Sequence, residues 1–162
     1  LQTVDFGGEQ IATLSDMLST LCRLRLSGNL EIKPSKRELA EQTAQVIFKT
    51  LKQQPNLPPL LISSFTWQTL TTLRQLGCQL PMALLLNEWS RAWSPVAKQL
   101  NVIGIHVDQK LATPKNIQAI KSAGYLLYCY NTNDPSRIQQ LLAAGVDGFF
   151  IDNIHSPSLP KK

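Results

Sequence analysis

The segments Asn29-Leu30-Glu31-Ile32-Lys33 and Ile62-Ser63-Ser64-Phe65 decide how this chain folds. The first segment contains the short, largely apolar run Leu30-Glu31-Ile32, and the second continues the run Leu60-Leu61-Ile62. Both runs have the length and residue types of a β-strand. Between the two runs, Ser35-Lys36-Arg37-Glu38 has the spacing of a capping box and precedes a stretch with helical periodicity. The sequence therefore predicts a strand, a helix and a second strand, which together form one βαβ unit.

The same alternation of strands and helices extends to both sides of this unit. Apolar runs predict further strands at residues 82–86, 102–107, 125–130 and 146–151. N-cap residues and helical spacing predict further helices at residues 13–25, 67–76, 89–100, 113–124 and 134–145. Pro95 either lies in the first turn of its helix or kinks it. Six near-continuous apolar strands, each reached through a helix, predict a parallel sheet covered by helices.

Two α/β architectures fit this order of elements. A doubly wound sheet is complete with five or six strands. A (β/α)8 TIM barrel has eight strands, so this chain would lack the first two βα units. The hydrophobic periodicity does not choose between the two. No G-x-G-x-x-G motif follows a predicted strand, which disfavours a dinucleotide-binding doubly wound fold.

The composition narrows the class of protein. The 162 residues are 43% hydrophobic and 17% charged, which excludes a disordered chain and predicts a single domain over residues 1–162. No apolar run has the length of a membrane helix, and no secretory signal is visible at the start. The separated Cys22, Cys78 and Cys129 are typical of reduced thiols and predict a cytoplasmic protein. The net charge of +5 comes from scattered Lys and Arg residues, so we expect no nucleic-acid partner.

Several motifs resemble those of the glycerophosphodiester phosphodiesterases, in particular the short cytoplasmic bacterial members of that family. The Asn29–Lys33 segment is similar to the family's N-x-E-x-K strand, and Ile62–Phe65 is similar to its S-S-F strand end. The other motifs that carry the resemblance are Val4-Asp5, Thr13-Leu14, Leu84–Trp89, Ile105–Val107 with Lys110-Leu111, Tyr130–Asn133 and Gly145–Asp152. Together these motifs extend over essentially the whole chain.

The motifs with which the family begins have no counterpart here. The family opens on an H-R-G strand end and P-E-N-T, followed by an E-x-D strand and an H-D strand. This chain starts at Leu1 without Met, and its two histidines, His106 and His155, stand in neither context. The resemblance implies strands three to eight of a (β/α)8 TIM barrel of this family's type. We therefore expect a truncated chain that forms the C-terminal three-quarters of the barrel.

The resemblance implies hydrolysis of glycerophosphodiesters to sn-glycerol 3-phosphate and an alcohol, with Mg²⁺ or Ca²⁺ as the cofactor. Glu31 ends a strand, and the resemblance makes it a metal ligand, a role that suits a carboxylate because these cations prefer oxygen. Lys33 lies two residues further and faces the same side of the strand. There the resemblance makes it a catalytic residue beside the phosphate. From the residues alone, an exposed ion pair between Glu31 and Lys33 is the alternative.

Four further residues are expected to bind the substrate. Phe65 and Tyr130 would wall the glycerol pocket, Asn133 would hydrogen-bond nearby, and His106 would line the rim without taking part in catalysis. Phe65 as a core aromatic and Asn133 as a turn residue before a helix are the alternatives. Asp152, in the loop after the last strand, is expected to be a structural cap.

Two classes of function fit these residues: a phosphodiesterase, or a non-catalytic α/β domain that binds a phosphorylated ligand or a protein partner. We expect the 162 residues alone to be inactive, because a single carboxylate holds Mg²⁺ or Ca²⁺ weakly. An incomplete barrel exposes two parallel strand edges, which favour association. The expected partners are therefore a small glycerophosphodiester and, as a homo-oligomer, a second copy of the chain.

Overall fold

The computed structural model describes residues 11–90 and 92–153 of the chain. Within these residues the helices are α1 (Leu14–Leu24), α2 (Ala40–Gln53), α3 (Trp67–Gln75), α4 (Trp93–Gln99), α5 (Pro114–Ser122) and α6 (Pro135–Ala143). The strands are β1 (Gly28–Glu31), β2 (Leu60–Ser64), β3 (Met82–Leu86), β4 (Gly104–Asp108), β5 (Leu126–Tyr130) and β6 (Gly148–Phe149). Short 3-10 turns at Arg37–Leu39 and Gln109–Leu111 precede α2 and α5. Helices and strands thus alternate in the predicted order.

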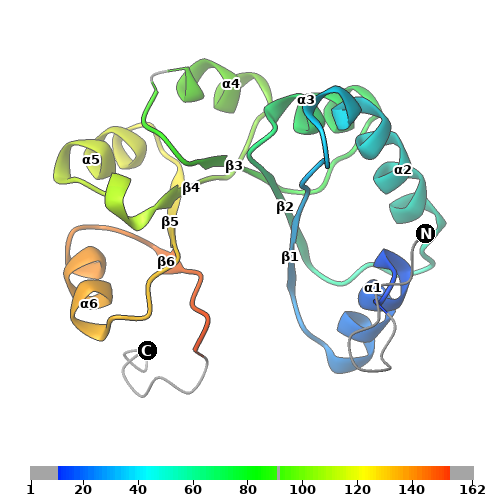
Figure 1. Cartoon of the computed structure of the whole chain (residues 1–162), viewed down its shortest axis with the longest axis horizontal. Coiled ribbons are helices and arrows are strands. Elements are labelled where there is room, and N and C mark those ends of the chain that lie inside the picture. The colour runs from blue at the N-terminus through cyan, green and yellow to red at the C-terminus, as the bar shows by residue number, and fades with distance from the viewer. Residues whose placement is uncertain (1–10, 91, 154–162) are drawn as a thin grey trace.

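All six strands lie in one parallel sheet, and their order in the sheet is their order in the chain. Figure 1 shows this sheet as a curved arc with helices along its convex side. A doubly wound sheet would reverse its strand order and carry helices on both faces. The arrangement therefore confirms the prediction of a (β/α) barrel of which this chain forms six strands.

The two faces of the arc differ in the side chains that they carry. On the convex face the register aligns Leu84 with Ile105, and both are fully buried beneath the helices. Burying each such side chain contributes roughly 1.5–3 kcal/mol. On the concave face the register places Ser63, Ala83 and Gly104 side by side. These small residues leave the concave face open for longer side chains from the ends of the strands.

The helix starts predicted for α1, α5 and α6 are confirmed. The Thr13 hydroxyl accepts a hydrogen bond from the backbone N–H of Asp16, and the Asp16 carboxylate accepts one from the backbone N–H of Thr13. Hydrogen bonds from the Thr13 side chain and backbone hold the pKa of Asp16 below its ordinary value. Thr113 and Asp134 cap α5 and α6, and a proline follows each of them at the first helical position.

The capping box predicted at Ser35–Glu38 is wrong. The backbone at Lys36 is extended, with φ of −140°, and leads into the 3-10 turn without a side-chain cap. The α-helix behind it begins only at Ala40, again without one. The segment instead forms a loop beyond the end of β1 that continues into the 3-10 turn at Arg37–Leu39, so Ser35 does not stand at the start of an α-helix. Sequence spacing alone did not reveal this geometry.

The boundaries of α4 and of the last strand also differ from the predicted ones. The α4 helix begins at Trp93 instead of residue 89, which places Pro95 in its first turn, one of the two predicted possibilities. The last strand covers Gly148–Phe149 instead of 146–151, because only Tyr128 and Cys129 of β5 pair with it. The motif Val4-Asp5 and His155 lie outside the described residues.

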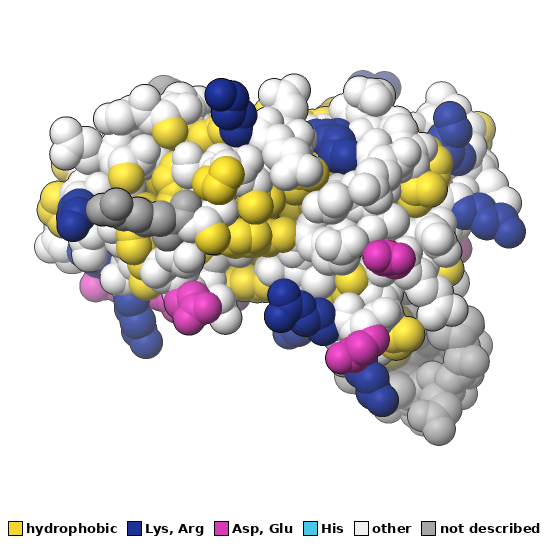
Figure 2. Space-filling model, turned by 90° about the horizontal axis from the view of Figure 1, so that it is seen from above, with side chains coloured by type: hydrophobic (Ala, Val, Ile, Leu, Met, Phe, Trp, Pro, Cys, Tyr) yellow, Lys and Arg dark blue, Asp and Glu magenta, His cyan; other side chains and the backbone are white. Residues whose placement is uncertain are grey.

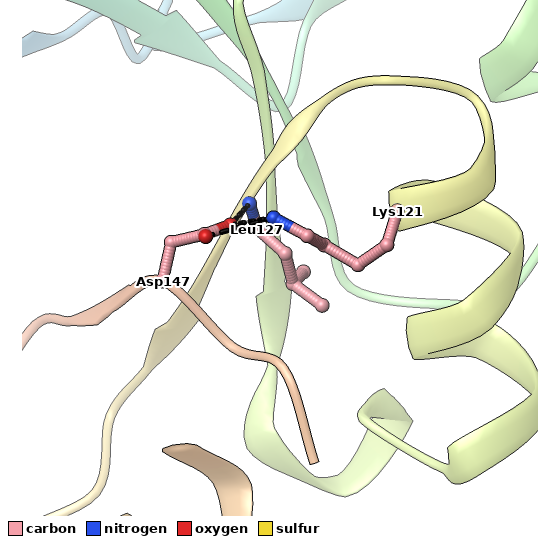
Figure 3. Close-up of polar contacts among 3 residues, drawn as sticks. All are labelled: Lys121, Leu127 and Asp147. Atoms are coloured by element: carbon pink, nitrogen blue, oxygen red, sulfur yellow. Dashed lines mark hydrogen bonds and ion pairs between the residues drawn. The ribbon is translucent and has the colours of Figure 1, made fainter. Parts of the chain in front are cut away.

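Asp147 ties three elements together where β5 and β6 begin. Its carboxylate accepts hydrogen bonds from the Lys121 ammonium of α5, at 2.6 and 2.7 Å, and from the backbone N–H of Leu127, at 2.7 Å (Figure 3). Lys121 and Asp147 also form an ion pair. Asp147, which belongs to the Gly145–Asp152 motif, is therefore a structural residue. It lies at the amino ends of β5 and β6, opposite the carboxyl ends of the strands.

Figure 2 shows part of the convex surface, and the described residues in this view form no continuous charged stripe. In Figure 2 hydrophobic side chains gather near the middle of this face, and Lys and Arg side chains are spread around them. Cys22, Cys78 and Cys129 are free thiols. None of the helices in the described part of the chain has the length and apolar character needed to cross a membrane.

Candidate active site

The carboxyl ends of the parallel strands form one rim, where (β/α) barrels carry their active sites. The register aligns Glu31 with Ser63 and Asp108 with Tyr130. Because side chains two residues apart share a face, these residues and Phe65 belong to the concave side of the rim. Segments far apart in the sequence thus bring two carboxylates and two aromatic rings to one place.

Tyr130 is the best-anchored residue of this rim. Its hydroxyl donates a hydrogen bond of 2.6 Å to the carbonyl oxygen of Leu86, and its ring meets Phe65 edge to face with centroids 5.7 Å apart. Burial, together with the negative charges of Asp108 and Glu31, raises the pKa of Tyr130 to about 12. Both carboxylates are therefore close enough to act on the phenol, which stays protonated at neutral pH.

Glu31 and Lys33 are both exposed at the end of β1. Neither takes part in an ion pair with any described residue, so the alternative of a paired Glu31 and Lys33 is not realised here. The backbone between them is fixed by β2: the Ser64 hydroxyl donates to the Ile32 carbonyl at 2.6 Å and accepts from the Thr66 N–H at 3.0 Å. Both side chains are therefore free to meet a ligand, on a backbone that is held in place.

His106 lies one layer below the rim. The strand continues two residues past it to Asp108, and its side chain is only 1% exposed. Its ring stacks on Tyr128 at 5.4 Å and packs against Phe150 at 5.0 Å, and no described residue bonds to its Nδ1. Burial lowers the pKa of His106 to about 4, so the imidazole is neutral at neutral pH.

Asn133 is held by the segment that follows β6. Its Oδ1 accepts hydrogen bonds from the backbone N–H groups of Asp152 and Asn153, and its Nδ2 donates to the Asp152 carboxylate. Asn131 donates to the same carboxylate at 2.9 Å. The amide of Asn133 is thus engaged in joining the β5–α6 loop to the end of the last strand, whereas Asp134 caps the helix.

Sequence reasoning missed two residues of this site. Asp108 faces the phenol of Tyr130, and its carboxylate accepts a hydrogen bond of 2.8 Å from the backbone N–H of Lys110. The predicted strand ended at Val107, one residue too early, although alternation from His106 would have placed Asp108 on the concave face. Ser64 was noticed only as part of a motif, because its bond to Ile32 crosses between strands.

Comparison with known proteins agrees with this fold. The model of the Glycerophosphoryl diester phosphodiesterase family matches residues 3–156. The chain belongs to this family. A phosphodiesterase of Oleispira antarctica, solved in complex with the product sn-glycerol-3-phosphate, is 29% identical, with a TM-score of 0.80. A glycerophosphodiester phosphodiesterase of Parabacteroides distasonis, 20% identical with a TM-score of 0.75, shares the fold.

The match to these family members is one of part to whole. The matches to the Oleispira and Parabacteroides structures cover 90% and 94% of this chain, but only 59% and 65% of those two proteins. Human glycerophosphocholine phosphodiesterase is 27% identical over 128 residues, which are 68% of this chain and 19% of the human protein. The chain thus corresponds to about three-fifths of the bacterial glycerophosphodiester phosphodiesterases that it resembles.

Members of this family generally use a divalent cation, and the residues of the rim fit such an ion in part. The Glu31 carboxylate is an exposed hard-oxygen donor at the strand end, and the Asp108 carboxylate lies on the same side of the rim. In residues 11–90 and 92–153, however, no three or more His, Cys, Asp or Glu side chains come close enough together to hold a metal. The described residues therefore offer a fraction of the six to eight oxygen ligands that Ca²⁺ prefers.

Proposed function

We propose that the whole protein hydrolyses glycerophosphodiesters to sn-glycerol 3-phosphate and an alcohol, in a metal-dependent reaction. The observation that supports this proposal is the rim itself, where Glu31, Phe65 and Tyr130 come together in a chain of this family. The Oleispira relative, which binds sn-glycerol-3-phosphate, supports the choice of product.

Glu31 and Lys33 are the two charged residues proposed to bind the metal ion and the phosphate. Glu31 would contribute a carboxylate oxygen to the Mg²⁺ or Ca²⁺ ion. When bound, such an ion offsets negative charge on the phosphoryl oxygens. The Lys33 ammonium lies two residues away on the same side and would offset further charge on the same phosphate. The fixed Ile32 backbone keeps the two groups at a constant spacing.

The other predicted residues bind or support the glycerol moiety. Phe65 and Tyr130 meet edge to face and offer an apolar wall to the carbon chain of glycerol. Asn133 borders the rim, and its bonds to Asp152 keep the last loop in position. His106 contributes from below by packing against Tyr128, as a neutral lining residue.

The test is release of sn-glycerol 3-phosphate from glycerophosphocholine by the whole protein, with and without a chelator. Replacing Glu31 by Gln should lower kcat/KM by about 100-fold, because a metal ligand is lost. Replacing Lys33 by Met should lower it by about 10-fold or more, because a cation that stabilises transition-state charge is lost. Full activity of both variants would contradict the proposed roles.

The 162 residues alone are proposed to be inactive, because they supply too few metal ligands. Turnover by this chain in isolation would overturn that statement. The runner-up function, a non-catalytic domain that binds a phosphorylated ligand, predicts binding of sn-glycerol 3-phosphate by the whole protein without turnover. We further propose a cytoplasmic location, in keeping with the three free thiols. For the 162 residues taken alone, we propose association of copies through the edges of β1 and β6.

A further inference from the structure

A cavity opens beside the rim, and Phe65 is one of the residues that line it. It has a volume of about 690 Å³ and is lined by the segments that follow β1, β2 and β3 and by one side of α3 and α4. Phe65 belongs to both places, because its ring contacts Tyr130 and also lines the cavity. A substrate whose phosphate lies at the rim could therefore extend its other half into this cavity.

The charged groups of this cavity are unpaired. Lys36 and Arg37 line it from the loop after β1, and Glu88 lines it from the loop after β3. None of the three side chains forms a hydrogen bond or ion pair with another described residue. Trp67 supplies a fixed wall, since its indole N–H donates to the Leu85 carbonyl at 3.3 Å. The described lining of the cavity therefore includes two cationic residues and one carboxylate.

The charged residues of the cavity favour some alcohol groups of a glycerophosphodiester over others. A quaternary ammonium group is recognised by several aromatic faces and by negative charge, whereas here the positive side chains are in excess. A carboxylate on the alcohol would match the guanidinium of Arg37, which binds such groups in a bidentate manner. An ammonium on the same alcohol would match Glu88. The complementary alcohol is thus one that bears its own anionic group.

We propose that this cavity is the subsite for the alcohol half of the substrate, and that it favours alcohols with an anionic group of their own. The inference rests on the proposed phosphodiesterase function, and it adds the preferred substrate class and the residues that set it. Arg37 and Lys36 hold the anionic group, and Glu88 faces an accompanying ammonium where the alcohol has one.

Glycerophosphoserine and glycerophosphoethanolamine form the matched pair of probes, because they differ only by the carboxylate of serine. The whole protein should hydrolyse glycerophosphoserine with a kcat/KM about 10-fold higher, the size expected of one charge-assisted hydrogen-bonded pair. Arg37→Gln should remove most of this preference, so that the kcat/KM values for the two diesters come within about 2-fold of each other. Lys52→Gln, which removes an exposed charge at the end of α2, should leave both values unchanged.

Calorimetric titration of the same protein in chelator, with the same two diesters, separates the two proposals. Tighter binding of glycerophosphoserine that is lost in Arg37→Gln supports the subsite even if no diester is hydrolysed, in which case only the proposed reaction fails. Hydrolysis of both diesters with equal kcat/KM and no effect of Arg37→Gln overturns the subsite and leaves the reaction standing. Neither binding nor hydrolysis overturns both.

Discussion

The hydroxyl of Tyr130 donates a hydrogen bond of 2.6 Å to the backbone carbonyl of Leu86, and so joins β5 to β3 across the intervening β4. The bond fixes the phenol ring against Phe65 and keeps its oxygen occupied. Tyr130 is therefore suited to shape the glycerol pocket, whereas a role as proton donor would require it to give up the Leu86 bond.

We expect Tyr130→Phe to lower the free energy of unfolding by about 1–2 kcal/mol, because the carbonyl of the buried Leu86 loses this partner while the ring contact is kept. Urea unfolding of the purified protein measures this change. Tyr125→Phe is the matched control, since the hydroxyl of Tyr125 bonds to no described residue, and its stability should stay the same. Equal losses in the two variants would contradict the assignment.

The pKa of His106, lowered to about 4 by burial, predicts how stability depends on pH. Between pH 6.5 and 4 the unfolded chain binds a proton at this residue and the folded chain does not, so stability falls as the pH is lowered through this range. The loss amounts to about 3 kcal/mol at most, from the size of the shift. His106→Phe, which keeps an aromatic ring on Tyr128, should remove this part of the pH dependence.

Urea unfolding at several pH values between 4 and 7 measures the effect. The wild-type protein and His106→Phe should differ in the slope of stability against pH, which reports the protons bound on unfolding. Since His106 is the histidine whose surroundings the structure describes, the variant isolates its contribution. Parallel curves for the two proteins would show that His106 is not buried in its neutral form.

Lys121 and Asp147 form an ion pair, and we expect the two residues to contribute unequally to stability (Figure 3). Both side chains are about one-third exposed, so the pair itself should contribute little. Lys121→Met is expected to cost under about 1 kcal/mol of stability. Asp147→Ala should cost about 1–3 kcal/mol, because the Leu127 N–H at the start of β5 also loses its acceptor. Thermal and urea unfolding compare the two, and equal losses would contradict the larger role of Asp147.

Much of the fold could be predicted because its signals are local. Capping residues such as Thr13 and Asp134 act on N–H groups two or three residues away, and the apolar runs mark the strands directly. The Ser35–Glu38 capping box shows the limit of such signals, since an equally good spacing occurs in a loop whose geometry excludes it.

The candidate site was only partly predictable, because it depends on contacts between distant segments. Glu31 and Tyr130 stand in recognisable motifs, but nothing local indicates that Asp108 faces the same phenol. The engagement of Asn133 by Asp152 likewise depends on how two loops meet at the rim. The depth of His106 depends on where its strand ends, and the sequence pattern placed that end one residue too early.

Ser63 and Ser64 are adjacent in β2 but differ in the hydrogen bonds of their hydroxyl groups. The Ser64 hydroxyl donates to the Ile32 carbonyl and accepts from the Thr66 N–H, whereas the equally buried Ser63 hydroxyl has no partner among the described residues. Ser64→Ala should cost about 1–3 kcal/mol of stability, because two backbone groups lose their partner. Ser63→Ala should be neutral or stabilising, because it removes a buried polar group without a hydrogen bond.

The same pair tests whether Ser64 positions Glu31 and Lys33, the residues proposed for the metal ion and the phosphate. Since Ile32 lies between Glu31 and Lys33, releasing its carbonyl should loosen the spacing of the two charged groups. We expect Ser64→Ala to lower kcat by about 10-fold in the whole protein, with a smaller effect on KM, because misplacement weakens transition-state stabilisation. Ser64→Thr, which keeps the hydroxyl, should restore part of the loss. An unchanged kcat in Ser64→Ala would contradict the positioning role and leave Ser64 a purely structural residue.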